Sequence, residues 1–100
     1  MHYMKMKMIR FSILHDMSKC FVCKKPRQAI HEIYFGTANR EQSIKYGCCV
    51  GLCHEHHNMS NEGVHYNKEL DLKLKRLCQK QFNRVYPSLD FVSIFGKNYL

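Results

Sequence analysis

The sequence predicts a small α+β domain stabilised by a structural zinc site, with a two-stranded antiparallel hairpin, a metal-binding helix or loop, and C-terminal helices. Three observations support this fold class. Cysteine and histidine occur in pairs at metal-ligand spacing, residues 28–35 alternate as a strand does, and apolar residues recur at helical spacing after residue 67. A chain of 100 residues has only a marginal core, so a metal ion adds stability that the core lacks.

The composition favours a polyanionic partner. Sixteen lysines and arginines stand against eight acidic residues, which gives a formal net charge of +8. No apolar run approaches the roughly 20 residues of a membrane span. Because no basic amphipathic helix of the interfacial type dominates, we expect nucleic acid rather than a membrane surface.

The six cysteines are predicted to be metal ligands or buried thiols rather than disulfides. Residues 1–9 alternate methionine with lysine and histidine and lack the apolar core of a signal peptide. The sequence therefore predicts a reducing compartment, in which cysteine pairs bind metal. We expect residues 1–17 to be a partly mobile extension, 18–66 the zinc-knuckle core, and 67–100 the helical part of the same domain.

Two pairs of residues predict one structural zinc site. Cys20 and Cys23 are separated by two residues, which lets both thiolates bend onto one ion. Cys53 and His56 share a face in the first turn of a helix, where they can complete the site. Four nearby residues compete with these ligands, or could replace one of them: Cys48, Cys49, His54 and His57.

Residues 28–35 and 45–52 are predicted to form the hairpin. In the first strand His31 shares an apolar face with Ala29, Ile33 and Phe35, whereas Glu32 lies on the opposite face. Residues 36–40 contain a glycine and an asparagine and are predicted to be a loop. Since this connection is short and carries no convincing crossover helix, the strands should be antiparallel.

A second histidine pair follows the zinc ligands. His57 points away from His56, because one helical position rotates a side chain by about 100°. His65 lies eight residues further on, which would separate the two by about 12 Å on a straight helix. The turn-forming residues 58–63 allow the chain to fold back, so His57 and His65 can meet.

The C-terminal third is predicted to be helical. Asn67 is a candidate N-cap, Pro87 ends the long helix, and Ser88 can cap a last short one. The residues expected to face the core are Leu70, Leu74, Leu77, Cys78, Phe82 and Val85, followed by Leu89, Phe91, Val92 and Phe95. The cations expected to contact phosphates are Lys24, Lys25, Arg40, Lys45, Lys73, Arg76 and Lys80.

The order of these motifs resembles the HNH nucleases of the ββα-metal fold. The matching elements are the Cys20–Cys23 pair, a strand with His31-Glu32, a second strand, Leu52-Cys53-x-x-His56-His57, and Gly63-Val64-His65. More narrowly, the pattern resembles that of small bacteriophage HNH proteins, and residues 95–100 are also similar to their tails. It implies a phage- or prophage-encoded enzyme that works in the bacterial cytoplasm, in recombination or DNA processing, with a recombinase as a possible partner.

The resemblance also implies metal-dependent cleavage of DNA phosphodiesters. A Mg²⁺ or Mn²⁺ ion would be held by His57 and His65, and the first strand would supply a further ligand and the general base. Either His31 is the base and Glu32 helps to hold the ion, or His31 is the ligand and Glu32 is the base. A histidine that titrates near pH 6.5 suits proton abstraction at neutral pH, which favours the first assignment.

The chain departs from the family pattern at two positions. Glu32 stands where the family has the second histidine of the strand, and Cys48 stands where the family has its asparagine. The alternative hypothesis is therefore a catalytically inactive zinc-knuckle module that binds nucleic acid through its basic surface. Only the enzyme needs His31, His57 and His65 to converge, so the structure can discriminate between the two.

Overall fold

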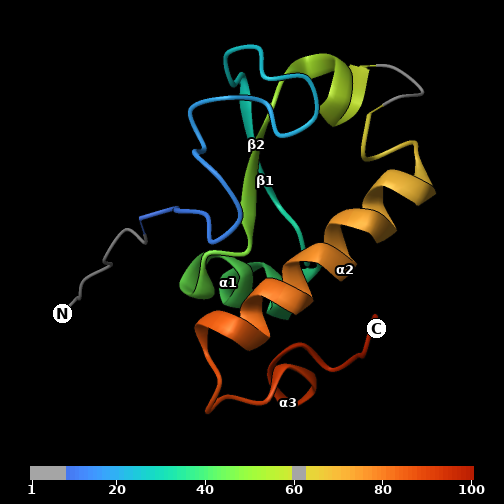
Figure 1. Cartoon of the computed structure of the whole chain (residues 1–100). Coiled ribbons are helices and arrows are strands. Elements are labelled where there is room, and N and C mark those ends of the chain that lie inside the picture. Colours follow the sequence, from blue (N-terminus) through green and yellow to red (C-terminus); the bar gives the residue numbers. More distant parts are fainter. Residues whose placement is uncertain (1–8, 60–62) are drawn as a thin grey trace, which may run out of the picture.

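A short hairpin stands at the centre of the molecule, and helices lie at both of its ends and along one side (Figure 1). The computed structural model describes residues 9–59 and 63–100. The long helix α2 runs down one side of the hairpin and passes in front of α1 at its lower end, and residues 9–28 run along the hairpin on the other side. The elements in chain order are β1 (Ala29–Glu32), α1 (Thr37–Tyr46), β2 (Cys49–Leu52), the π-helix η1 (Glu55–Met59), α2 (Lys68–Val85) and α3 (Phe91–Phe95).

The hairpin is antiparallel, as the sequence predicted. Ala29 pairs with Leu52 and His31 pairs with Val50. All four residues of β2 are buried, so this strand lies within the core. Strand β1 ends at Glu32, earlier than predicted, and the alternation of faces ends with it.

Helix α1 was not predicted. Residues 36–40 were expected to be a loop and Lys45 to begin a strand, but Thr37–Tyr46 form a helix that connects the two strands. This expectation was wrong because residues 37–46 lack the stripe of apolar residues from which an amphipathic helix is predicted. It is fixed instead by Ser43, whose hydroxyl accepts from the N–H of Tyr34 at 3.1 Å and donates to the carbonyl of Tyr34 at 2.8 Å. Gly47 ends it in the left-handed conformation.

Helix α2 begins where the sequence predicted. The side chain of Asn67 accepts from the N–H of Leu70 at 3.0 Å. Leu74, Cys78 and Phe82 are fully buried and form the centre of the core. Val85 was predicted to face this core and does not, because it is the last residue of the helix and is 43% exposed.

The C-terminal residues pack beneath α2. Asp90 caps α3, accepting from the N–H of Val92 at 3.2 Å, so the expectation for Ser88 was wrong. Phe91 and Phe95 are buried against Tyr34, as predicted for the two phenylalanines. The two aliphatic residues expected beside them, Leu89 and Val92, are exposed.

One buried cluster, from Cys20 to Phe95, includes residues of the Cys20–Cys23 turn (the knuckle), the hairpin, α2 and α3. No helix within the described residues has the length and apolar character needed to cross a membrane.

Candidate metal centres

The turn that carries Cys20 and Cys23 is held by backbone hydrogen bonds. The N–H of Cys20 donates to the carbonyl of Lys25 at 2.7 Å, and the N–H of Lys24 donates back to the carbonyl of Cys20 at 2.9 Å. Lys24 has a φ of 69°, a left-handed conformation that closes the turn tightly. The N–H of Phe21 bonds to the carbonyl of Gly51 at 2.8 Å, which fastens the turn to β2. Both thiols are thereby placed over the end of the hairpin.

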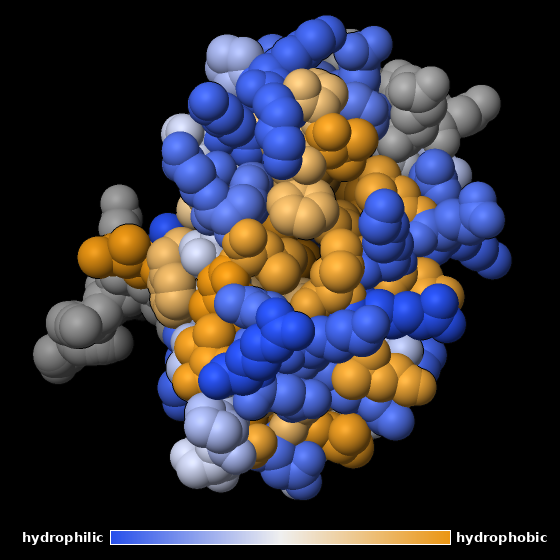
Figure 2. Space-filling model, in the orientation of Figure 1, coloured by the Kyte–Doolittle hydropathy of each residue, from blue (hydrophilic) through white to orange (hydrophobic). Residues whose placement is uncertain are grey.

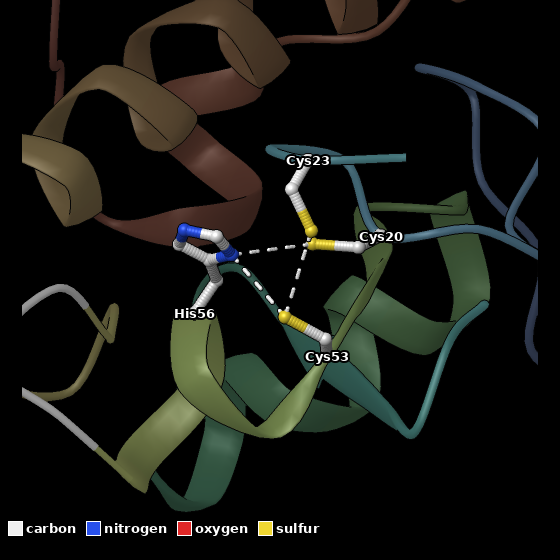
Figure 3. Close-up of side chains that lie close together, drawn as sticks. All are labelled: Cys20, Cys23, Cys53 and His56. Atoms are coloured by element: carbon white, nitrogen blue, oxygen red, sulfur yellow. Dashed lines mark hydrogen bonds between the residues drawn. The ribbon is translucent and has the colours of Figure 1, made fainter. Parts of the chain in front are cut away.

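The four predicted zinc ligands converge on one point (Figure 3). The sulfur of Cys23 lies 3.7 Å from that of Cys53, and the Nδ1 atom of His56 lies 3.2 Å from Cys53 Sγ and 3.7 Å from Cys20 Sγ. A tetrahedral zinc ion with ordinary bond lengths requires edges of about 3.8 Å between sulfurs and about 3.6 Å between sulfur and nitrogen. The donor set and its spacing therefore fit a metal ion such as zinc.

The backbone around Cys20 favours its thiolate, which is the form that binds metal. Burial by itself raises the pKa of this thiol, but hydrogen bonds from backbone N–H groups, those of Cys23 and Cys53 foremost, bring it down to about 6. Burial raises the pKa of Cys53 above its ordinary value. The site thus contains one thiol that ionises readily and one that does not.

The competing ligands considered above lie elsewhere. A hydrogen bond with Cys78, together with burial, raises the pKa of Cys48, and burial raises that of Cys49 to about 12. Both are neutral, buried thiols at physiological pH and belong to the core. His54 is exposed, and among the described residues the four-ligand group does not include it.

A second group consists of His31, His57 and His65 (Figure 1 shows their elements, β1, η1 and the segment before α2). Their candidate ligand nitrogens all lie within 4.8 Å of one another, and the Nε2 atoms of His57 and His65 are 3.0 Å apart. Adjacent imidazole nitrogens on one ion lie about 2.9 to 3.3 Å apart for ordinary bond lengths. The predicted convergence of the three histidines is confirmed.

The convergence depends on a close approach of two backbone segments. The N–H of Val64 donates to the carbonyl of His56 at 2.8 Å, and the N–H of His65 donates to that of His57 at 3.1 Å. A Cβ atom on Gly63 would lie 2.9 Å from the carbonyl carbon of His57, so this position needs glycine. The fold-back predicted from turn formers is therefore present, although residues 60–62 lie outside the described part of the chain.

His31 has the clearest mark of a ligand. It is 3% exposed, and its Nε2 atom has no hydrogen-bond partner within the described structure. Burial, then the neighbouring charges of His57 and His65, lower the pKa of His31 to about 3, so the ring is neutral. A buried imidazole nitrogen without a partner is costly, and a metal ion would satisfy it.

Glu32 does not join the three histidines. Its carboxylate pairs with Arg10 at 2.9 Å and with Arg40 at 3.3 Å. The assignment that places Glu32 on the metal and makes His31 the base does not fit this arrangement. His31, in contrast, belongs to the group of side chains that could hold a metal ion. Burial, and then the charge of His65, lower the pKa of His57. The negative charge of Glu32 partly offsets this lowering, so the two side chains interact electrostatically.

The nature of the donors also bears on the ion. Three imidazoles and no carboxylate suit Zn²⁺ or Ni²⁺, whereas Mg²⁺ and Mn²⁺ prefer oxygen ligands. The expected Mg²⁺ or Mn²⁺ therefore fits this group less well than a transition-metal ion with an affinity for nitrogen.

The predicted phosphate-binding cations fall into separate places. Arg40 is on α1, paired with Glu32, and Lys45 lies over the ring of Tyr46. Lys24 lies over the ring of Phe21, and Lys25 is 3.9 Å from Glu55.

The cations of α2 border a groove of about 520 Å³, which adjoins a second one of about 280 Å³ beneath residues 14–21. Figure 2 shows hydrophobic residues gathered in the middle of this face between hydrophilic margins. Lys75 lies on another side of α2. Lys73 and Lys80 point roughly 140 to 160° around the helix axis from it. The residues that line the first groove are Glu69, Leu72, Lys73, Arg76, Leu77 and Lys80.

Comparison of the chain with family models, with curated proteins and with solved structures finds no match. The assignment of function therefore rests on the two centres and their geometry.

Proposed function

We propose that this protein is a metal-dependent nuclease of the HNH type, which hydrolyses phosphodiester bonds in DNA. The observation that carries the proposal is the second centre. A zinc-stabilised binding module has no need for three further histidines whose ligand nitrogens lie within 4.8 Å of one another. The resemblance of the motif order to the HNH pattern and the formal net charge of +8 support the choice of DNA as substrate.

In this proposal the two centres have different roles. Cys20, Cys23, Cys53 and His56 hold a structural zinc ion that fastens the knuckle to the hairpin. His31, His57 and His65 hold a divalent ion, which when bound polarises the scissile phosphate and stabilises the leaving oxygen. Since all three histidines are ligands, none of them is left to act as the general base.

Glu32 is the candidate for the base. It follows His31 directly, and its carboxylate is bound by the guanidinium groups of Arg10 and Arg40. A guanidinium bound to a carboxylate can exchange that carboxylate for another anion, so a DNA phosphate can bind Arg40 while the released carboxylate of Glu32 accepts a proton from water. In this proposal, binding of a phosphate by Arg40 releases Glu32 from their ion pair.

The second candidate function is a nucleic-acid-binding module without activity. The observation that favours it is the same pair of ion pairs, because a carboxylate held by two guanidinium groups is not poised to accept a proton. A role in phage recombination or DNA processing, with a recombinase as partner, rests on the resemblance alone.

The test is nicking of supercoiled plasmid by zinc-loaded protein, with Zn²⁺, Ni²⁺, Mn²⁺ or Mg²⁺ added in turn. His31→Ala and His57→Ala should each lower the rate at least about 100-fold, because each removes a ligand. His54→Ala is the matched control, an exposed histidine of the same segment outside both groups, and should cut as the wild type does. A folded wild type that binds DNA and never cuts it would favour the binding module.

A further inference from the structure

Phe35 is an aromatic residue beside the histidine centre that the fold does not need as core. It is 49% exposed, although the side chains just before it in the chain, Ile33 and Tyr34, are buried. Its ring centroid lies 6.0 Å from that of His31 and 6.2 Å from that of His65. An exposed aromatic ring therefore forms one side of the second centre.

Lys75 lies over the same ring. Its Nζ atom is 4.3 Å from the ring centroid of Phe35 and 5.7 Å from that of Tyr99. Asp71 accepts from this Nζ at 2.9 Å, and the side chain of Lys75 is only 14% exposed. The ammonium group is thus held in one place, so little side-chain entropy remains to be lost when an anion binds.

We propose that Phe35 and Lys75 bind the substrate strand next to the histidine centre, with a nucleobase against the ring and a backbone phosphate near the ammonium, so that the site takes single-stranded DNA. A base can use an exposed ring in this way only when its own face is uncovered, as in a single strand or an unpaired region. The inference rests on the proposed function for the identity of the substrate, and it adds the substrate class.

The proposed binding site at Phe35 and Lys75 differs from the groove on α2. Lys73 and Lys80 border the groove, well around the helix axis from Lys75, so one strand at the histidine centre does not meet both sides of the helix. The structure therefore makes Lys75, rather than Lys73, Arg76 or Lys80, the cation of α2 that serves the centre.

The first experiment measures binding rather than cleavage. Affinity for a fluorescent single-stranded oligonucleotide with phosphorothioate linkages, which slow hydrolysis, is compared with affinity for its duplex. Phe35→Leu should weaken single-strand binding roughly 5- to 100-fold, the range for loss of one stacked base, and change duplex binding less than about twofold. Phe35→Tyr should restore most of the affinity. Phe11→Leu is the matched control, since Phe11 is 42% exposed and packs on Gly47 instead.

The second experiment measures the salt dependence of the same binding. Loss of one phosphate contact on a single strand lowers the slope of log K against log salt by about 0.7. Lys75→Gln should show this loss, and the double variant with Asp71→Asn should show it too, which separates the lost cation from the freed carboxylate. Lys19→Gln, at an exposed lysine with no ion pair among the described residues, should keep the wild-type slope.

The outcomes separate this inference from the proposed function. Cleavage with single-strand binding that is indifferent to Phe35→Leu overturns the inference alone, as does a slope lowered by Lys80→Gln and not by Lys75→Gln. Single-strand binding that needs Phe35, in a protein that never cuts, supports the inference and overturns the enzyme. No binding of nucleic acid in either form overturns both.

Discussion

The two centres share one short helix and differ in almost everything else. His56 and His57 are neighbours in η1, yet one belongs to the cysteine-rich group and the other to the histidine group. The first group has four donors, two of them fully or nearly buried cysteines, Cys20 and Cys53. The second has three donors, of which His65 is exposed. A closed set of four suits a structural ion, and an open set of three leaves room for substrate.

The difference also lies in what each centre joins. The cysteine group joins Cys20 and Cys23 in the turn to Cys53 and His56, which follow β2, and it adds to the backbone bond from Phe21 to Gly51. The histidine group is assembled on backbone that is already fixed, by the β1–β2 pairing and by the bonds from Val64 and His65 to η1. We therefore expect loss of the first centre to unfold the domain and loss of the second to leave it folded.

The largest expected effect follows from removal of a cysteine ligand. Cys53→Ser should abolish folding, because structural zinc supplies on the order of 10 kcal/mol in small domains. Circular dichroism and zinc content of the purified protein measure this. Cys49→Ala is the control, since Cys49 is equally buried but is not a ligand, and it should cost only about 1 to 2 kcal/mol. A Cys53→Ser protein that is folded and fully loaded with zinc would contradict the comparison.

The next effect compares the two neighbours in η1. His56→Ala should lower the thermal midpoint sharply and release zinc, whereas His57→Ala should keep the fold and one bound zinc ion. The reason is that His56 Nδ1 lies 3.2 Å from Cys53 Sγ, while the Nε2 atom of His57 lies 3.0 Å from that of His65. Metal analysis after dialysis, beside thermal melts, measures both. Equal losses of zinc in the two variants would show that the centres are not independent.

A smaller and more specific effect is expected at Gly63. Gly63→Ala should push the backbone of residues 63–65 away from η1, because the added Cβ would approach the backbone of His57 to 2.9 Å. We expect a loss of about 1 to 3 kcal/mol of stability and at least a tenfold loss of metal affinity at the histidine centre.

Gly36→Ala is the control for this change. Gly36 has a φ of 101° and open space around its Cα, so alanine there strains the backbone without displacing a histidine. Calorimetric titration of the zinc-loaded proteins with a second metal ion distinguishes the two. If both variants bind that ion as the wild type does, the close approach at Gly63 does not position His65.

The sequence was sufficient for the parts of the fold that side-chain chemistry determines. The spacing of Cys20, Cys23, Cys53 and His56 predicted their convergence, and the asparagine at residue 67 predicted the start of α2. Helix α1 was missed because its position depends on Ser43 and Tyr34, a long-range pair that no local pattern reveals.

The histidine centre was predicted in its members but not in their roles. Alternation along β1 already placed His31 and Glu32 on opposite faces, yet the ordinary pKa of histidine favoured His31 as the base. In the structure burial lowers the pKa of His31 to about 3, which makes the neutral ring a weaker base than that argument assumed. The contact between Lys75 and Phe35 was not predicted, because the two residues are 40 positions apart and only the packing of α2 brings them together.

The smallest expected effect tests a contact, other than the metal site, that holds the residues before the Cys20–Cys23 turn on β2. The N–H of Gly51 donates to the Nε2 atom of His15 at 3.2 Å, so the imidazole must be neutral there. Burial first, and then the charge of Lys24, lower the pKa of His15 in the folded protein, against a raising effect of Asp16. The unfolded chain therefore binds the proton more readily, and this contribution is complete above about pH 6.5 and is lost as the pH falls below it.

We expect the loss to be about 0.5 kcal/mol, the lower end of the range for one hydrogen bond, because a partly exposed group is screened by solvent. His15→Gln keeps an acceptor and removes the titration, so its stability should change less than that of the wild type between pH 7.5 and 6. Urea unfolding at the two pH values, with zinc content checked at each, measures the difference. Identical pH dependence in both proteins would mean that this hydrogen bond does not contribute to the attachment of these residues to β2.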